Sequence, residues 1–342
     1  MKILKYLFFL LLVLVIGFAI YIATLESKYD IKQTRIIKAP AEVIFNNIND
    51  FKNWQHWNPW FELDSTIVAS YPDDTSGVGA SYTWTGKDGS GTMRTISLIP
   101  NKEIIQQIDF GAGSTPEVYW DITTTETGNA VTWGMRGNRS FGEKIYWLTQ
   151  GGIEKNMIPM YHRGLELLEQ HLIKEMDKHS FEIIGEIDFG GGYYLYQTTS
   201  CKIDLIDEKK EEMFSNVFKF MKDNAIEASG KPFLLTHNWD EVNKTTMFSA
   251  CVPVKERIIT TGNVLTGFLN PQKTFKTIYK GSYKYSYEAW ESAYKKLAEQ
   301  GFKELEGGEP FEVYTIRPTD DPNPANWITE IYIPINNSDR QF

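Results

Sequence analysis

Cysteine is scarce in this chain of 342 residues, and the scarcity limits the covalent and metal chemistry available to it. The two cysteines, Cys201 and Cys251, are too few for a disulfide scaffold and lack metal-ligand spacing. We expect both on strands of a second domain as buried free thiols, with a disulfide between them as the open alternative. The five histidines show no metal-binding pattern either. The sequence therefore predicts no metal site and no cofactor.

Familiar catalytic motifs are also missing. The sequence contains no G-x-S-x-G nucleophile elbow, no P-loop, no G-x-G-x-x-G fingerprint and no H-E-x-x-H pair. Basic residues are outnumbered, with 35 Lys and Arg against 44 Asp and Glu, which gives a formal net charge of −9. Non-specific nucleic-acid binding relies on clustered positive charge, so we expect no nucleic-acid partner. Whether the protein catalyses a reaction stays open at this point.

A long uncharged run at the N-terminus is the clearest physical signal in the chain. Twenty residues from Tyr6 to Leu25 carry no charge, and a helix of that length spans about 30 Å, the thickness of a bilayer core. The exit from the run is a poor cleavage site, which favours an uncleaved anchor (residues 1–28) over a cleaved signal peptide. Lys2 and Lys5 favour a cytoplasmic N-terminus. We expect a single-pass protein of the inner (cytoplasmic) membrane, with its body on the periplasmic or extracytoplasmic side.

Residues 29–178 have the pattern of an α+β domain. A strand from Tyr29 to Lys38 is followed by a helix that Pro40 opens, and then by an aromatic loop. The long helix that closes the domain carries apolar residues every three or four positions from Ile153 to Leu172, and Pro159 should kink or loosen its start. Between the loop and this helix we expect about six antiparallel strands: Thr66–Tyr71, Ala80–Thr85, Gly91–Ile99, Glu103–Phe110, Val118–Thr125 and Ala130–Arg136.

Two segments of this domain carry a family resemblance. The lead-in Ile37–Val43 and the segment W-x-x-W-N-P-W at 54–60, with this order of elements, resemble the polyketide cyclase/START-like (SRPBCC, helix-grip) superfamily. The resemblance implies an antiparallel sheet wrapped around the long C-terminal helix, with an apolar cavity between them. His56 and Trp57 would then line the cavity. The alternative for both residues is an aromatic packing corner.

A short polar joint, Asp177–His179, leads to a second α+β domain at residues 179–336, and residues 337–342 form a tail. We expect strands at Phe181–Ile187 and Tyr193–Ile203, then a helix with Asp207 as its N-cap. The order strand, helix, strand, strand recurs from Lys273 onward, which predicts an internal duplication.

The stretch from Tyr279 to Ile335 organises this second domain. Its helix carries a stripe of bulky residues at Tyr283, Tyr287, Trp290, Tyr294 and Leu297, with Gly301 as the predicted C-cap. A strand follows at Phe311–Arg317. Alternate side chains of a strand share a face, so Glu312 and Tyr314 should lie side by side.

Several segments of this domain resemble the GyrI-like effector-binding domain. They are Gly230–Phe233, Cys251–Val254, Lys280–Tyr283, the E-x-Y of residues 312–314 and Trp327–Pro334. The resemblance implies that Glu312 lies at the base of a pocket, beside Tyr314, and attracts cationic aromatic ligands. It implies that Trp239, Tyr283 and Trp327 form an aromatic wall. A solvated strand carboxylate is the alternative for Glu312, and Glu330 could be a structural carboxylate.

These patterns together indicate a membrane-anchored small-molecule binding protein with two apolar pockets, one per domain. It would sense, sequester or carry an amphipathic or cationic aromatic ligand. Two alternatives stay open: a hydrolase or cyclase that acts on a hydrophobic molecule with Glu312 and Tyr314, and a structural or interaction protein without a ligand. The usual neighbour of the effector-binding module is a helix-turn-helix reader. Nothing basic enough for one is present, which argues against direct transcription control.

Overall fold

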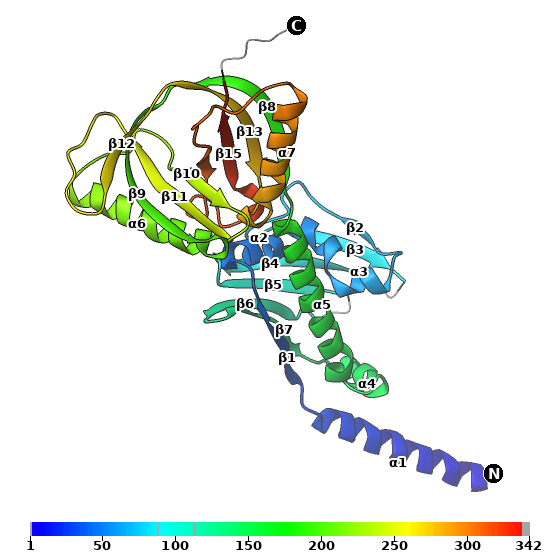
Figure 1. Ribbon diagram of the computed structural model, residues 1–342. Helices are drawn as coiled ribbons and strands as arrows, with labels where there is room; N and C mark the ends of the chain where they lie inside the picture. Colours follow the sequence, from blue (N-terminus) through cyan, green and yellow to red (C-terminus); the bar gives the residue numbers. More distant parts are fainter. Residues whose placement is uncertain (1, 88, 112–113, 337–342) are drawn as a thin grey trace. The chain divides into compact units, whose positions relative to one another are not determined.

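The computed structural model describes residues 2–87, 89–111 and 114–336 (Figure 1). The predicted tail, residues 337–342, lies outside the described residues. Contacts within the chain divide it into two compact units, Met1–Lys174 and Glu175–Phe342. Each unit is an α+β structure with its own antiparallel sheet, and this is the predicted fold class.

Helix α1 (Lys2–Thr24) opens the first unit. Its segment Ile3–Thr24 has a mean hydropathy of 2.8 and is almost entirely exposed, so it is long and apolar enough to cross a membrane. A signal sequence near an N-terminus would have the same length and composition. Ile22, near the end of the helix, is fully buried.

The first unit contains a seven-stranded antiparallel sheet in the order β1-β7-β6-β5-β4-β3-β2. The six predicted strands after the first helix are present within a few residues of their expected bounds, because turn residues separate segments of alternating pattern. The strands are β1 (Lys28–Ile37), β2 (Val68–Ser70), β3 (Ser81–Gly86), β4 (Gly89–Ile99), β5 (Glu103–Asp109), β6 (Glu117–Thr125) and β7 (Gly128–Asn138). Helix α2 (Ala41–Asn49) follows Pro40, as predicted.

Two details of the first unit correct the sequence analysis. The expected aromatic loop is helical: η1 (Phe51–His56) and α3 (Pro59–Leu63) are N-capped by the side chains of Asp50 and Asn58. The closing helical stretch is two helices, α4 (Phe141–Thr149) and α5 (Ile153–Met176), with Pro159 inside α5. They are separated at Gly151 and Gly152, whose positive φ angles break the helix.

Helix α5 lies beside the sheet (Figure 1), and buried aromatic rings form the core between them. Trp120 stacks on Trp133 with ring centroids 4.4 Å apart, and Trp133 stacks on Tyr161 of α5 at 4.7 Å. All three side chains are at most 2% exposed. A Cβ atom at Gly164 would lie 2.5 Å from the Trp133 ring, so only glycine lets α5 approach this closely.

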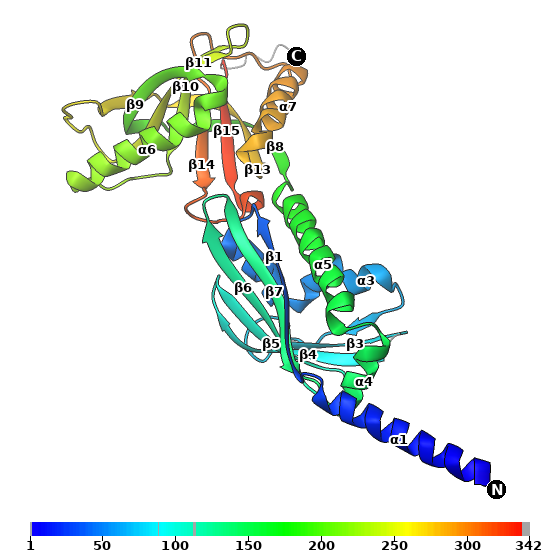
Figure 2. The ribbon, with the colours of Figure 1, turned by 90° about the horizontal axis from the view of Figure 1, so that it is seen from below.

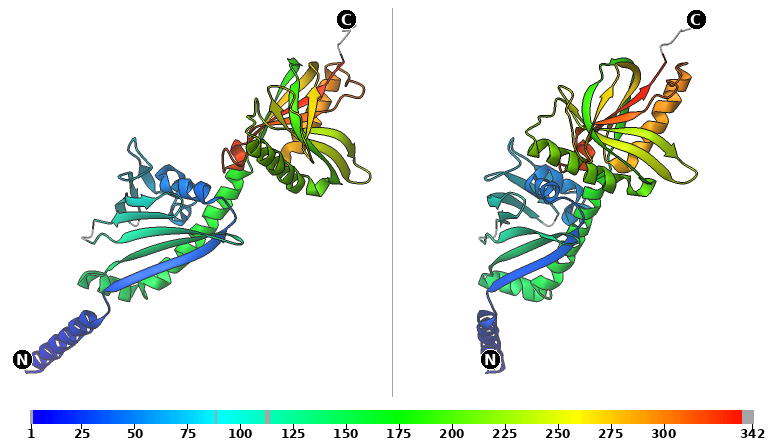
Figure 3. Two further views of the ribbon diagram at one scale, coloured as in Figure 1. Left: turned by 90° about the vertical axis from the view of Figure 1, so that its left-hand side faces the viewer. Right: turned by 60° about the vertical axis from the view of Figure 1, so that its left-hand side comes forward.

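The second unit (green to red in Figure 3) contains an eight-stranded antiparallel sheet in the order β12-β9-β11-β10-β14-β15-β13-β8. Its helices are α6 (Ile206–Asp223) and α7 (Ser286–Glu299). The strands are β8 (Ser180–Phe189), β9 (Gly192–Lys202), β10 (Phe233–Asp240), β11 (Thr245–Val254), β12 (Leu265–Leu269), β13 (Gln272–Lys280), β14 (Phe311–Ile316) and β15 (Ile328–Pro334).

The predicted duplication is visible in the strand pairing. In the half β9-α6-β10-β11 the first strand pairs with the third, and the half β13-α7-β14-β15 repeats this arrangement. Strands β10 and β14 join the two halves at the centre of the sheet. Helix α6 packs over β9 and β11, and α7 packs over β13 and β15. The central strands therefore lie between the two helices.

The predicted helix ends and faces need three corrections. Leu205 is the N-cap of α6 and makes no side-chain capping bond, whereas Asp207 lies in the first turn. Helix α7 buries Ala289, Ala293 and Leu297, and Tyr287 of the predicted stripe is 61% exposed. Small alanines let α7 lie close to the sheet, so they occupy the centre of the inner face. The larger rings of Trp290 and Tyr294 are only partly buried beside them. Gly301 follows the C-cap residue Gln300 as the left-handed glycine of a Schellman motif.

The cysteines are free, as the sequence analysis expected. Cys251 on β11 is fully buried, and Cys201 on β9 is partly exposed. Cys201 lies opposite Thr246 in the β9–β11 register, so the two thiols are not cross-strand neighbours.

Candidate ligand-binding site

Strand β14 places Glu312 and Tyr314 on one face, as its alternation predicts. The Tyr314 hydroxyl donates a hydrogen bond of 2.7 Å to one oxygen of the Glu312 carboxylate. The other oxygen accepts a hydrogen bond of 2.5 Å from the indole nitrogen of Trp290 on α7. Both donors are neutral, so they fix the carboxylate in position without neutralising it. Among the described residues, the carboxylate forms no ion pair with a lysine, arginine or histidine. Trp290 was expected only as part of the helix stripe, so its role as a donor was missed.

A group of aromatic side chains lies beside this carboxylate. Tyr314 is 2% exposed, and the ring of Tyr283 lies 5.5 Å from it. Trp327 packs against Tyr283 at 4.9 Å, and its indole nitrogen donates to the Asp321 carbonyl. The structure thus brings together four of the residues named from the sequence: Glu312, Tyr314, Tyr283 and Trp327.

A lysine of α6 points its ammonium into the same aromatic group. The Lys210 Nζ atom lies 4.0 Å from the ring centroid of Tyr283 and 5.1 Å from that of Tyr314. The Lys210 side chain is only 4% exposed, and its ion-pair partner, Asp207 at 2.7 Å, is 72% exposed. The sequence analysis missed this residue. It occupies the same stripe of α6 as the buried Met213, Phe214 and Val217, and a lone charge on an apolar stripe is the signal that could have revealed it.

The two phenols of the group are held in their neutral form. Burial raises the pKa of Tyr314, and the adjacent Glu312 carboxylate raises it further because a second negative charge would be repelled. Burial likewise raises the pKa of Tyr283, with Glu211 and Glu312 as the next contributions. A neutral Tyr314 is a hydrogen-bond donor, so the arrangement can orient a carboxylate. It does not supply a phenolate nucleophile at neutral pH.

Trp239 and Glu330 lie apart from this group. Trp239 is 52% exposed near the end of β10, and its indole nitrogen donates a hydrogen bond to the Glu241 carboxylate. Glu330 on β15 lies opposite Val313, so it faces the other side of the sheet from Glu312. There it pairs with Lys276 at 3.0 Å and accepts a hydrogen bond from Tyr332. These contacts give Glu330 a structural role.

The two residues predicted to line a cavity in the first unit differ in how far they are buried. Trp57 is 1% exposed and packs edge-on against Trp120 and Trp133, in the aromatic core. His56 is exposed and stacks on His171 with ring centroids 5.2 Å apart. Within the part of the chain that the structure describes, no three His, Cys, Asp or Glu side chains gather to hold a metal ion.

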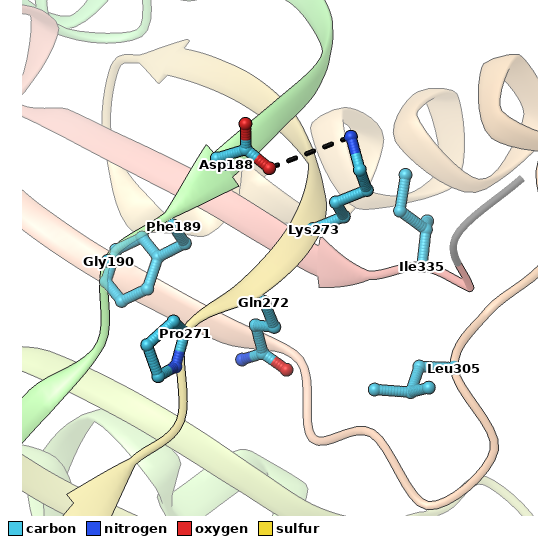
Figure 4. Close-up of a pocket in the computed structure, with 8 residues that line it drawn as sticks. All are labelled: Asp188, Phe189, Gly190, Pro271, Gln272, Lys273, Leu305 and Ile335. Carbon is cyan, nitrogen blue, oxygen red and sulfur yellow. Dashed lines mark ion pairs between the residues drawn. The ribbon is translucent and has the colours of Figure 1, made fainter.

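Two open hollows lie in the second unit, and neither is lined by Glu312 or its aromatic neighbours. The first lies between the β8–β9 and β12–β13 turns on one side and Leu305 and Ile335 on the other. Figure 4 shows the Lys273 side chain at its rim, directed toward Asp188 at 3.7 Å. The second lies along α6 and β9. Because both are wide open to solvent, we place the candidate site at Glu312, where a partly buried carboxylate, the buried Lys210 ammonium and aromatic rings lie in one group.

Comparison with known families matches residues 194–336 to the GyrI-like small molecule binding domain. This part of the chain is a GyrI-like domain. The match contains Glu312, Tyr314, Tyr283, Trp327 and Lys210, and it covers none of the first unit. The helix-grip assignment of the first unit therefore remains a prediction.

Solved structures resemble the chain at low identity. The C-terminal domain of EcmrR is 17% identical, with 47% of this chain and 98% of that chain covered and a TM-score of 0.38. An EcmrR–DNA complex is 16% identical, covers 58% and 71%, and has a TM-score of 0.42. Protein CV1439 from Chromobacterium violaceum is 14% identical, covers 42% and 96%, and has a TM-score of 0.32. No curated protein matches the chain.

Proposed function

We propose that this protein is a membrane-anchored small-molecule binding protein, and that its GyrI-like domain holds an amphipathic organic cation beside Glu312. The observation that carries the proposal is the environment of the Lys210 ammonium. A buried ammonium is costly unless its surroundings compensate the charge. The rings of Tyr283 and Tyr314 and the carboxylate of Asp207 already compensate one organic cation, so the same surroundings suit the cation of a ligand.

The contacts within the site suggest a different role for each of its residues. Glu312 supplies the negative charge, and Trp290 and Tyr314 keep it oriented. Trp327 is a partly exposed ring in contact with Tyr283, and it offers an apolar surface to the body of the ligand. Charge attraction and aromatic burial then act on different parts of one amphipathic molecule.

Binding without catalysis fits these contacts better than hydrolysis. Tyr314 and Glu312 could serve as an acid–base pair, which is the enzymatic alternative. However, burial and the adjacent carboxylate raise the pKa of Tyr314 and oppose its deprotonation. We infer a role in sensing, sequestration or carriage of the ligand. The net charge of −9 supports a chain without a nucleic-acid partner.

We place the protein in the inner membrane, with α1 as its anchor and the two units on the extracytoplasmic side. Helix α4 supports this placement because it adjoins the end of α1 (Figure 2). Lys144 of α4 donates to the Ala23 carbonyl at 3.4 Å, and Arg139 donates to the Glu26 carbonyl at 2.8 Å. Three large side chains of α4 are exposed beside this junction, as expected of a helix at a membrane surface: Phe141, Tyr146 and Leu148.

The binding proposal is tested by titration of the full chain in non-ionic detergent with two isosteric ligands. Phenyltrimethylammonium carries a positive charge, and tert-butylbenzene has nearly the same shape without it. Calorimetry with matched detergent blanks should give tighter binding for the cation. Equal affinities, or tighter binding of the neutral compound, would contradict a cation site. Extraction of membranes with carbonate tests the anchor separately, and the protein should stay in the pellet.

A further inference from the structure

The position of Lys210 raises the question of how a ligand could enter a site that already holds a cation. The ammonium lies over the Tyr283 ring at 4.0 Å, in the place where the proposed function puts the ligand's cation. The side chain is 4% exposed, so a ligand cannot reach that face of the ring while Lys210 stays. Lys210 and the ligand must compete for one position.

We propose that Lys210 is a built-in competitor of the ligand, so that a ligand binds only by displacing its ammonium; this inference rests on the proposed function. Lysine suits that role because its four-carbon stem is flexible and its charge is strongly hydrated once released. Its partner Asp207 is 72% exposed, so the ion pair can move to the surface with the ammonium. Release of Lys210 therefore leaves no buried charge unpaired.

Competition by Lys210 also defines the chemical class of the ligand. When Lys210 leaves, the two tyrosine rings lose the positive charge that lay over them, and only a ligand with its own cation restores it. The side chain that vacates the site is an alkyl stem that ends in an ammonium. The structure therefore assigns the site to amines or quaternary ammonium compounds with an apolar body, and Lys210 rejects neutral molecules of the same shape.

Replacement of the competitor tests this inference. Lys210→Met keeps the apolar stem and removes the charge, and Lys219→Met makes the same change on α6 at an exposed position paired with Asp223. In full chains in non-ionic detergent, Lys210→Met should bind phenyltrimethylammonium about tenfold more tightly than the parent, since a desolvated cation–π contact no longer has to be broken. Lys219→Met should bind like the parent, and Lys210→Arg, which keeps the charge over the rings, should bind no more tightly than the parent.

The outcomes separate this inference from the proposed function. If the parent binds the cation and Lys210→Met binds it no more tightly, Lys210 is a structural residue and the inference is wrong, while the cation site stands. If neither protein binds, the cation site itself is wrong. Binding by Lys210→Met alone would support both, because the parent would then be blocked by its own lysine. Thermal unfolding of each variant checks that the fold is kept.

Discussion

Two glutamates on neighbouring strands differ in whether a positive charge neutralises them, and we expect only one of them to bind a cation. Glu330 faces one side of the sheet, where the Lys276 ammonium neutralises it at 3.0 Å. Glu312 faces the other side, where both of its hydrogen-bond donors are neutral. A hydrogen bond from a neutral donor orients a carboxylate without neutralising it. Glu312 therefore keeps its attraction for a cation, and Glu330 does not.

His179 is the residue through which we expect pH to affect the stability of the second unit. The ring contacts the Asp177 carbonyl at 2.9 Å and the Glu288 carboxylate at 3.1 Å. The carbonyl first, and then the carboxylate, favour the protonated ring and raise the pKa of His179 above its ordinary value of 6.5. A raised pKa in the folded state means that the stabilisation is complete below the unfolded-state pKa and is lost as the pH rises through the folded-state pKa.

We therefore expect the stability of the second unit to fall as the pH rises from 6.5. Denaturant unfolding at a series of pH values would measure this fall. The variant His179→Gln should unfold at a denaturant concentration that changes less over the same range. An identical pH profile for the variant and the parent would show that His179 does not carry the effect.

Single residues of the site were predictable only in part. Strand alternation placed Glu312 beside Tyr314, because a period of two follows from strand geometry alone. The donor Trp290 and the cation Lys210 come from α7 and α6. Their approach to β14 depends on how both helices pack on the sheet, and local sequence pattern does not specify that packing.

At the scale of elements, α4 is the part of the first unit that we expect to touch the membrane. The chain has ten tryptophans, none of them in α1, and Trp147 lies on α4. In vesicles that contain brominated phospholipid, which quenches nearby tryptophans, the parent should lose part of its fluorescence. The lipid-dependent loss of fluorescence should be much smaller in Trp147→Phe. In Trp84→Phe, which changes a tryptophan of β3, this loss should be as large as in the parent. Unchanged quenching in Trp147→Phe would place α4 away from the lipid.

The contact between α5 and the aromatic core gives a stability prediction. A Cβ atom at Gly164 would lie 2.5 Å from the Trp133 ring and 2.9 Å from Pro59, so Gly164→Ala should overpack the core. We expect a loss of about 1–3 kcal/mol in the free energy of unfolding. The control Gly142→Ala on α4 meets no atom within 4 Å and should be neutral or stabilising. Equal stability of the two variants in denaturant unfolding would contradict the close packing of α5.

Helices and strands were predicted well where a local sequence pattern determines their position. The strands followed from alternation and turn residues. The stretch around the three tryptophans was expected as a loop, because the capping roles of Asp50 and Asn58 were overlooked. The inner face of α7 was predicted only in part: Leu297 is buried and Trp290 and Tyr294 are partly buried, but Tyr287 is exposed. Bulk was taken as the sign of burial, whereas Ala289 and Ala293 are buried because they are small enough for close approach to the sheet.

At the scale of the whole molecule, we expect the two units to fold independently, since each has its own sheet and aromatic core. Fragments 27–176 and 177–342 keep α5 intact and leave Asp177 with its partner His179. Each fragment, expressed alone, should unfold in one cooperative thermal transition. A fragment without such a transition would show that its unit depends on the other.

Function could be predicted from the sequence to different degrees in the two units. The second unit carries short sequence segments, such as E-x-Y, that resemble a known family, and its residues 194–336 match the GyrI-like domain. The first unit shows an order of elements and a packed aromatic core. Neither feature names a ligand, because aromatic side chains that fill a core and those that line a cavity have the same composition.

The measurement that tests the central claim most directly is the effect of Glu312→Gln on cation binding by the full chain. Glutamine keeps the shape of the side chain and removes its charge. Binding of phenyltrimethylammonium should weaken by about 1–3 kcal/mol, the scale of a charge-assisted contact out of water. Binding of tert-butylbenzene should hardly change, and Glu330→Gln on the opposite face should bind both ligands like the parent. If Glu312→Gln also binds both ligands like the parent, Glu312 does not hold the cation and the account is wrong.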